Sequence, residues 1–262
     1  MMIHPLAVVS KNAEIHETTT IGPFCIIGED VKIGKNNNLI SHVSISGNTS
    51  IKDNNSFYPF SSIGSDPQDL KFKNEISYLE IGNNNKFREN VTINPGTQGG
   101  GLKTVIEDNC LFMVGSHVAH DCKIKSNVIL VNNVTLAGHV NIFENAIVGG
   151  LSGIHQFVNI GKFAMIGGMS GVESNIIPYG LYTGVRSELR GLNLVGLKRK
   201  GLNKENINQI NSIIKNIFNK ENSIEKNINK LSDKDKSIIE INEIINFINL
   251  NFKRGIARLR ND

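Results

Sequence analysis

Apolar residues recur at every sixth position through the middle of the chain. The uninterrupted run is Ile106, Phe112, Val118, Ile124, Leu130, Leu136, Ile142, Val148, Ile154, Ile160, Ile166 and Val172. Neither an α-helix nor an ordinary strand has this period. A six-residue repeat is typical of a parallel β-helix, in which three repeats close one coil. We therefore predict that residues eighteen apart lie on adjacent coils, separated by one strand spacing of roughly 4.8 Å.

The same repeat begins near the N-terminus and is interrupted twice. Its first members run from Ile3 to Ile63, and it resumes at Ile81. Residues 65–78 between them are polar and contain a proline, so we predict an excursion loop. Loops of this kind often contain binding residues, although a merely solvated insertion is the alternative. Residues 94–101 form a second, glycine-rich break before the long run.

Glycine and asparagine mark the expected corners of the coils. Glycine follows several core residues, as at Gly22 and Gly64, where a corner needs either a positive φ or close backbone approach. The asparagine clusters 36–38 and 83–85 tolerate the same left-handed conformation. The three cysteines stand two residues before a core position, where small residues are found elsewhere: Cys25, Cys110 and Cys122. We interpret them as packing residues, because their number is odd and no CxxC spacing occurs.

The hydrophobic pattern changes after Pro178. Apolar residues then follow helical spacing in three stretches, 207–218, 224–231 and 238–248. Asn203, Ser223 and Ser232 precede these stretches and are the expected N-caps. The predicted fold class is mainly β, with a parallel β-helix over residues 1–185 followed by a small α-helical C-terminal domain over residues 186–262.

Charge is unevenly distributed between the two predicted parts of the chain. The chain has 262 residues, no Trp and a net charge of +4, but from residue 186 onward sixteen Lys and Arg face nine Asp and Glu. The basic helical part predicts an acidic partner, although a solvated surface is the alternative. Aromatic residues are not interleaved with the basic ones, so we expect no nucleic-acid partner. We also expect no signal peptide, no membrane span and a cytoplasmic location.

The main candidate site is a group of polar residues and one glycine that the period brings together on neighbouring coils. They are His117, His120, Asp121, Gly138, His139, His155 and Gln156. A neutral imidazole beside a carboxylate is the usual general base near neutral pH. Adjacent strand residues normally point to opposite faces, so a hydrogen bond between His120 and Asp121 stays open.

Two other interpretations of the histidine cluster remain open. Three histidines on neighbouring coils could form a catalytic zinc site, as in γ-class carbonic anhydrases, which share the six-residue repeat. The spacing of His117 and His120 does not match the pattern of that family. The histidines could also bond corner carbonyls in a non-enzymatic β-helix.

Several segments together resemble the UDP-N-acetylglucosamine O-acyltransferases that begin lipid A synthesis in Gram-negative bacteria. They span essentially the whole chain: residues 21–28, IGPFCIIG; 68–71, QDLK; 117–122, HVAHDC; 136–140, LAGHV; 155–157, HQF; and 196–199, GLKR. The resemblance implies a homotrimer of left-handed β-helices with active sites between subunits. It also implies transfer of a 3-hydroxyacyl chain from acyl carrier protein to the sugar 3-hydroxyl of UDP-N-acetylglucosamine.

The resemblance implies roles for individual residues. His120 would be the general base, with Asp121 beside it, and the Gly138 N–H would stabilise the oxyanion. Positions that match substrate contacts are Gln68, Asp69, Lys71, His117, His139, His155, Gln156, Asn193 and Arg199. Gly168 matches the end of the acyl tail, and neither a cofactor nor a metal is expected.

Two positions depart from the family pattern. Val195 replaces a common acidic residue, and Lys200 replaces a second arginine, which a lysine cannot match in a bidentate phosphate contact. We expect these replacements to alter nucleotide affinity and not the chemistry at His120. We expect an acidic carrier protein to be attracted by the positive charges of Lys198, Lys200 and Lys204.

Overall fold

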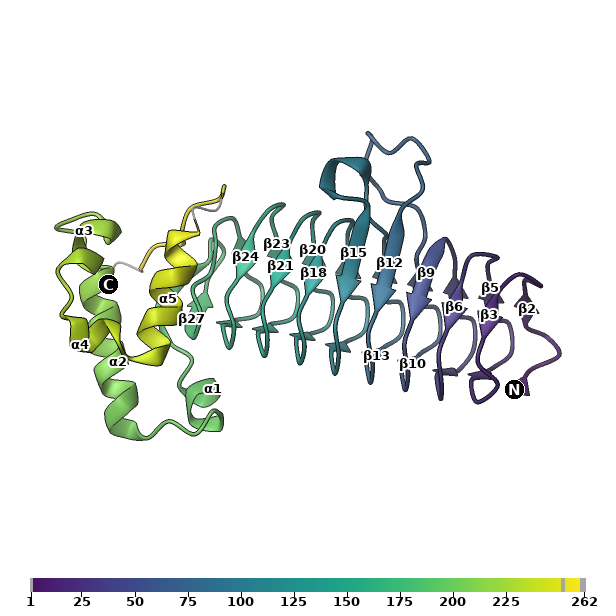
Figure 1. Ribbon diagram of the computed structural model, residues 1–262, viewed down its shortest axis with the longest axis horizontal. Helices are drawn as coiled ribbons and strands as arrows, with labels where there is room; N and C mark the ends of the chain where they lie inside the picture. The colour runs from purple at the N-terminus through teal and green to yellow at the C-terminus, as the bar shows by residue number, and fades with distance from the viewer. Residues whose placement is uncertain (1, 251–252, 260–262) are drawn as a thin grey trace.

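The computed structural model describes residues 2–250 and 253–259. Short strands form a long three-sided prism, and helices cover its C-terminal end (Figure 1). Within the described residues the prism has three sheets of eleven, nine and eight strands, in which every strand-to-strand pairing is parallel except the last, β27 with β28. The prediction of a mainly β protein with a parallel β-helix and a small helical C-terminal part is confirmed.

The first sheet contains β1 (Met2–Ile3), β4 (Thr20–Ile21), β7 (Asn38–Leu39), β10 (Ser56–Phe57), β13 (Lys86–Phe87), β16 (Leu111–Phe112), β19 (Ile129–Leu130), β22 (Ile147–Val148), β25 (Met165–Ile166), β27 (Gly180–Thr183) and β28 (Glu188–Leu192). The second contains β2 (Val8–Val9), β5 (Ile26–Ile27), β8 (Ser44–Ile45), β11 (Ser62–Ile63), β14 (Thr92–Ile93), β17 (His117–Val118), β20 (Thr135–Leu136), β23 (Gly153–Ile154) and β26 (Gly171–Val172). The third contains β3 (Glu14–Ile15), β6 (Lys32–Ile33), β9 (Asn48–Ile51), β12 (Tyr78–Ile81), β15 (Lys103–Ile106), β18 (Lys123–Ile124), β21 (Asn141–Ile142) and β24 (Asn159–Ile160).

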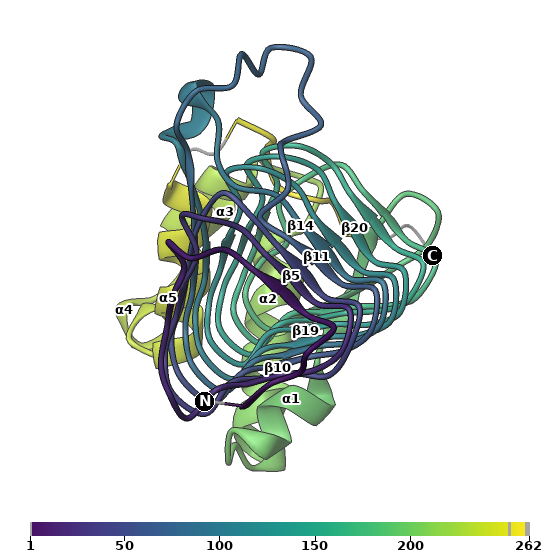
Figure 2. The same cartoon turned by 90° about the vertical axis from the view of Figure 1, so that its right-hand side faces the viewer.

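The pairing register follows the predicted eighteen-residue period. His117, for example, pairs with Thr135 on the next coil. Thr92 pairs with both Ser62 and His117, so the two breaks in the repeat leave the ladder intact and project from it as loops. Figure 2 shows the prism from its N-terminal end. The chain runs counterclockwise through the first, second and third sheets while it recedes, which is the left-handed sense.

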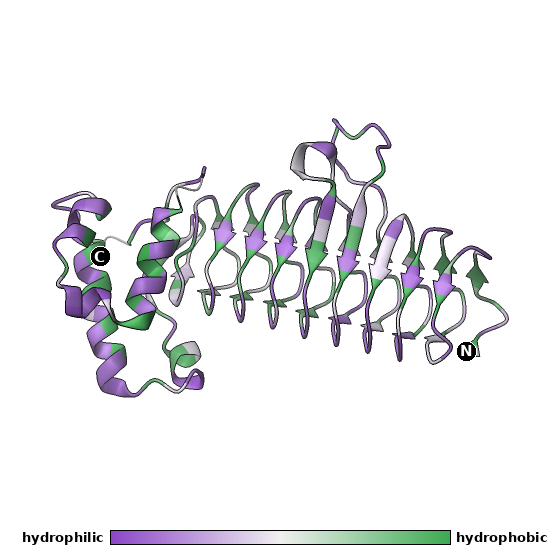
Figure 3. Cartoon of the chain, viewed as in Figure 1, coloured by the Kyte–Doolittle hydropathy of each residue, from purple (hydrophilic) through white to green (hydrophobic). Residues whose placement is uncertain are grey.

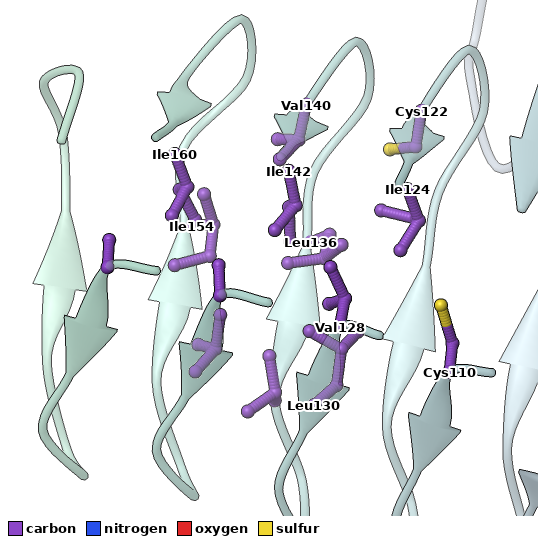
Figure 4. Packing of buried hydrophobic residues seen from close by; sticks show 14 of the residues in the cluster. Cys110, Cys122, Ile124, Val128, Leu130, Leu136, Val140, Ile142, Ile154 and Ile160 are labelled. Carbon is purple, nitrogen blue, oxygen red and sulfur yellow. The ribbon is translucent and has the colours of Figure 1, made fainter. Parts of the chain in front are cut away.

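Repeat residues fill the interior of the prism. Apolar and polar residues alternate along the strands (Figure 3), and the apolar repeat residues are buried. Ile, Val and Leu from successive coils stack inside (Figure 4), and Phe57, Phe87 and Phe112 form a ring stack with centroids 4.8 and 4.9 Å apart. All three cysteines are buried and free, and burial raises the pKa of Cys110 to about 12. They are packing residues, as predicted.

The corners use both of the devices expected from the sequence. Asn36 and Asn84 have φ of 54° and 59°, and Gly64 has φ of 80°. Gly22 serves close approach instead, because a Cβ there would lie 1.8 Å from the carbonyl oxygen of Ile40. The corner chain therefore passes near its neighbour at one glycine and turns through the left-handed region at another.

The helical part comprises α1 (Leu194–Arg199), α2 (Lys204–Ile217), α3 (Ile224–Asn229), α4 (Asp233–Lys236) and α5 (Ile239–Asn249). Asn203, Ser223 and Ser232 each accept a hydrogen bond from a backbone N–H as the N-caps of α2, α3 and α4, as predicted. The expected domain boundary at residue 185 falls in the turn between β27 and β28 and stays a prediction. Among the residues described, no helix has the length and apolar character needed to span a bilayer.

Candidate active site

His120 and Asp121 form the centre of the candidate site. They follow β17, at the corner between the second and third sheets. Nδ1 of His120 lies 2.8 Å from Oδ2 of Asp121, although adjacent strand residues point apart. The corner explains the difference, since Asp121 has a left-handed backbone with φ of 61° that turns both side chains to one side. The hydrogen bond left open by the sequence is therefore present.

Two threonines that the sequence interpretation missed hold Asp121 in place. Thr97 donates its backbone N–H to Oδ1 over 3.0 Å and its hydroxyl to Oδ2 over 2.6 Å. Thr104 accepts the backbone N–H of Asp121 over 2.8 Å. Burial raises the pKa of the Asp121 carboxyl, but the hydrogen bonds from His120 and Thr97 outweigh it and leave this pKa below its ordinary value. The buried carboxylate is thus ionised near neutral pH.

An ionised carboxylate fixes the tautomer of His120. Because Asp121 can only accept, the proton of the neutral imidazole belongs on Nδ1. Nε2 then presents its lone pair on the other side of the ring, where Oδ2 of Asp69 lies 3.9 Å away. The imidazole is nearly buried, with 7% of its residue surface exposed. This arrangement gives one oriented proton acceptor at the surface of the prism.

Nε2 faces a groove of about 590 Å³. Its lining brings together seven of the predicted site residues with three small or apolar neighbours: Gln68, Asp69, Leu70, Lys71, Ala119, His120, Ala137, Gly138, His155 and Gln156. The excursion loop supplies one wall and successive coils supply the other. Asn94 of the second break donates its side-chain amide to the carbonyls of Ser65 and Asp66 and so anchors the loop. The loop therefore forms one wall of the groove, and its role in binding stays a prediction.

Gly138 stands on the coil next to His120. A Cβ at this position would lie 2.3 Å from Cε1 of His120, so only glycine leaves room for the ring. Among the described residues, no hydrogen-bond acceptor meets the Gly138 N–H. An open N–H donor and the free Nε2 of His120 therefore occur on neighbouring coils at the same groove.

Two partly buried histidines, His117 and His139, lie beside this centre and do not line the groove. His139 packs edge-on against His120 with ring centroids 5.1 Å apart, and its ring stacks on Phe157 at 4.5 Å. Nδ1 of His117 lies 2.7 Å from the hydroxyl of Thr92. Burial lowers the pKa of both His117 and His139 and so favours their neutral forms.

Asn193 and Arg199 lie in a different cavity of the same chain. This cavity has a volume of about 810 Å³, and outward residues of the first sheet, including Ile129, Ile147 and Met165, line it together with α1. The Asn193 side chain caps α1 by accepting the Gly196 N–H and also donates to the carbonyl of Phe163. A single chain therefore does not bring Asn193 and Arg199 to His120.

Lys200 is already paired within the chain, and its expected effect on nucleotide affinity stays a prediction. Its ammonium group lies 2.6 Å from a carboxylate oxygen of Glu240 and 3.1 Å from the hydroxyl of Tyr179. Its charge is therefore paired within the chain, where it joins the end of α1 to α5. Val195 is 60% exposed in the same cavity as the exposed Arg199. Arg199 and Lys200 both line this cavity, and Lys200 is the one already paired with a carboxylate.

Comparison with known proteins decides the family. A full-length relative, the acyl-carrier-protein–UDP-N-acetylglucosamine O-acyltransferase of Thermodesulfovibrio yellowstonii, is 46% identical over 98% of this chain and 99% of its own. The chain belongs to the UDP-N-acetylglucosamine O-acyltransferase family. The expectation of an acyltransferase is thereby confirmed.

Further comparisons agree with this family. The enzyme of the same name from Paracoccus denitrificans is 51% identical over 124 residues, which are 47% of this chain and 48% of that protein. The crystal structure of the UDP-N-acetylglucosamine acyltransferase of Francisella novicida matches with a TM-score of 0.94 and 38% identity, over 99% of this chain and 95% of that one. Residues 175–257 match the family model described as UDP N-acetylglucosamine O-acyltransferase, domain 2, and residues 103–138 match the bacterial transferase hexapeptide model.

The side chains around His120 do not suit the zinc site that was the alternative interpretation of the histidine cluster. His120, Asp121 and His139 place possible ligand atoms within 4.8 Å of one another. A catalytic zinc site of the carbonic anhydrase type needs three histidines with an open position. Here Nδ1 of His120 already faces Asp121, whose two oxygens also accept both donors of Thr97. The group is arranged to orient an imidazole.

Proposed function

We propose that the protein transfers a 3-hydroxyacyl chain from acyl carrier protein to the 3-hydroxyl of UDP-N-acetylglucosamine, the reaction that begins lipid A synthesis. The family and the groove support this assignment, and the geometry of His120 carries it. A nearly buried imidazole bonded through Nδ1 to an ionised carboxylate has Nε2 available for a proton. A general base of this kind commonly contributes roughly 10²–10⁴-fold to the rate.

In the proposed reaction, Nε2 of His120 takes the proton from the sugar hydroxyl as its oxygen attacks the thioester carbonyl. The Gly138 N–H donates to the oxygen of the tetrahedral intermediate, where developing negative charge strengthens the hydrogen bond. The proton on Nε2 then passes to the leaving thiolate of the carrier. Asp121 stabilises the imidazolium during this cycle and keeps the ring oriented.

The groove lining suggests the substrate contacts. Gln68, Asp69 and Lys71 of the excursion loop and His155 and Gln156 of the coils surround the space in front of Nε2. Their amide, carboxylate, ammonium and imidazole groups suit the hydroxyls and the N-acetyl group of a sugar. His117 and His139 act behind His120 because neither lines this groove. No step needs a cofactor.

The acyl tail would end at a glycine strip on a different corner from His120, the corner between the first and second sheets. Gly150 and Gly168 face each other on adjacent coils, and the backbone N–H of Met169 donates to the Gly150 carbonyl over 2.8 Å. The stacked glycines leave this strip without side chains. We propose that Gly168 marks the end of the slot and allows a long 3-hydroxyacyl chain.

We further propose a homotrimer in which Asn193 and Arg199 of one subunit complete the groove of the next. Arg199 then supplies the charge for the nucleotide phosphates. Exposed apolar residues recur at the corner between the first and second sheets, where a monomer would leave them in water: Phe24, Phe60, Leu151 and Met169. An exposed apolar edge of this length suits contact between copies of the chain.

Complementation between subunits tests the reaction and the assembly together. His120→Ala and Arg199→Ala are assayed separately with UDP-N-acetylglucosamine and a 3-hydroxyacyl carrier, and then after co-expression in equal amounts. Both variants alone should be nearly inactive. Random mixing should restore about a quarter of the wild-type activity, because about a quarter of sites in a cyclic trimer would combine intact His120 and Arg199. Absence of recovery would refute the composite site, and an inactive wild type would refute the proposed reaction.

A further inference from the structure

The segment that follows α5 returns to the β-helix beside the candidate active site. Asn175, which is fully buried, donates its side-chain amide to the carbonyl of Gly255 over 2.6 Å. The backbones of Asn175 and Gly255 bond over 2.9 Å, and the Ala257 N–H donates to Asn175 over 2.9 Å. The segment thus occupies the place that a further coil would take. Its backbone anchors do not depend on the side chains of residues 253 and 254.

Lys253 covers the open end of an aromatic column. Asp121, His139 and Phe157 occupy equivalent corners on three successive coils, and all have φ between 61° and 69°. Phe157 stacks on His139, and the Lys253 ammonium lies 4.7 Å from the centroid of the Phe157 ring. A cation over an aromatic face is attracted by the ring quadrupole. The column therefore runs from Lys253 through Phe157 and His139 to the edge of His120.

Arg254 reaches the neighbouring column. Its Nε donates to the backbone carbonyl of Gln156 over 2.9 Å. Gln156 lines the groove and lies one coil beyond Gly138. The half-buried guanidinium therefore fixes the backbone on which a groove residue is mounted.

We propose that Lys253 and Arg254 are positioning residues for acyl transfer, which hold the His139–Phe157 column and the Gln156 backbone in register with His120. The inference rests on the proposed function, because it assigns these side chains a role in that reaction. Neither residue reaches the groove, so both act through others. Misplacement of a reacting group by about 1 Å can lower a rate by about 100-fold.

Charge adds a second effect of Lys253. The titratable groups around His139 are Asp121 and His120 at equivalent or adjacent positions of the corner, Asp69 of the excursion loop, Lys253 and, in the same cavity, Lys123. Burial lowers the pKa of His139, Asp121 and Asp69 raise it, and His120 and Lys253 lower it further. Removing the ammonium should therefore raise this pKa. A protonated His139, with Nε2 3.8 Å from Oδ2 of Asp121, would compete with His120 for the carboxylate.

The test uses the full-length protein and matched pairs of variants. Lys253→Met keeps the stem and removes the charge, Lys253→Arg restores it, and Lys236→Met on α4 is the control. Arg254→Met removes the donor, Arg254→Lys restores one, and exposed Arg258→Met on the same segment is the control. We expect Arg254→Met to lower kcat about 10-fold with KM little changed, and Arg254→Lys to recover most of it. Lys253→Met should move the acidic limb of the kcat/KM profile to higher pH, because removing the ammonium favours the protonated form of His139.

A measurement that does not need turnover separates this inference from the proposed function. In protein labelled with ¹³C-histidine, NMR titration should show a higher pKa for His139 in Lys253→Met than in the wild type, and no change in Lys236→Met. If both 253 and 254 variants match their controls in rate, pH profile and titration, the positioning role is refuted. If the wild type transfers no acyl chain, the proposed function fails, while the titration still decides whether Lys253 acts on His139.

Discussion

Replacing Asp121 by asparagine tests how the base is oriented. Oδ1 of Asp121 accepts a backbone N–H of Thr97, so the amide oxygen of an asparagine must take that place. Its NH₂ group then faces Nδ1 of His120, where Oδ2 now lies at 2.8 Å. Nδ1 must become an acceptor, and the imidazole proton moves to Nε2. The variant keeps its shape and loses the lone pair that should take the substrate proton.

The expected loss follows from that change of tautomer. We expect kcat to fall by about 10²–10⁴-fold, the usual contribution of a general base. KM for the sugar nucleotide should change little, because Asp121 does not line the groove in front of Nε2. Hydrogen bonds to a charged group contribute about 1.5–3 kcal/mol each, so the free energy of unfolding should also fall.

The pH dependence of stability gives an independent check on Asp121. Its pKa is lowered in the folded state, so its stabilisation is present above the unfolded pKa of about 3.9 and is lost as pH falls through the folded value. Urea unfolding of the wild type should therefore weaken below about pH 4 by more than that of Asp121→Asn.

A buried control at the same corner is Thr104→Val, which removes the acceptor for the Asp121 N–H and leaves the carboxylate bonds intact. It should be destabilised by about 1–3 kcal/mol yet retain most of its kcat. The orientation argument is refuted if Asp121→Asn, folded and assembled, keeps kcat within about twofold of the wild type.

Three further predictions concern other parts of the site. Gly138→Ala should lower kcat by about 100-fold or more, since its Cβ would lie 2.3 Å from Cε1 of His120; steady-state kinetics on a variant of unchanged melting temperature checks this, and near-normal activity would disprove the contact. Gly168→Met should shift the preference of the enzyme to a 3-hydroxyacyl chain shorter by several methylenes, because burial of each methylene contributes about 0.8 kcal/mol. Competition between carriers of graded length measures this preference, and unchanged selectivity would refute the prediction. KM for the acyl carrier should rise with ionic strength if exposed Lys198 and Lys204 attract the carrier. A KM that does not change with salt concentration would contradict this attraction.

The repeat made the fold predictable because each core position is set by one short period. The interior of the prism is so narrow that the residue at every sixth position must be apolar, as at Leu130 and Leu136. The same period places His120, Gly138 and Gln156 in one column. The sequence therefore predicted the part of the site that belongs to regular coils.

The remaining parts of the site depend on backbone outside the repeat. Thr97 lies in the second break, where no register fixes the path of the chain, so its bond to Asp121 could not be predicted. Thr104 could have been found from the sequence, because it stands two residues before the core residue Ile106. The repeat makes this position interior, and a buried hydroxyl there needs a hydrogen-bond partner. The return of Arg254 to Gln156 spans 98 residues and follows no period.

The central claim is that Nε2 of His120 takes the proton from the attacking sugar hydroxyl. The most direct measurement is kcat/KM of purified His120→Ala with UDP-N-acetylglucosamine and a 3-hydroxyacyl carrier, beside His16→Ala as a control on the first coil. The account predicts a loss of about 10²–10⁴-fold for His120→Ala with the fold and assembly retained, and wild-type activity for His16→Ala. A His120→Ala protein that keeps more than about half of the activity would contradict it.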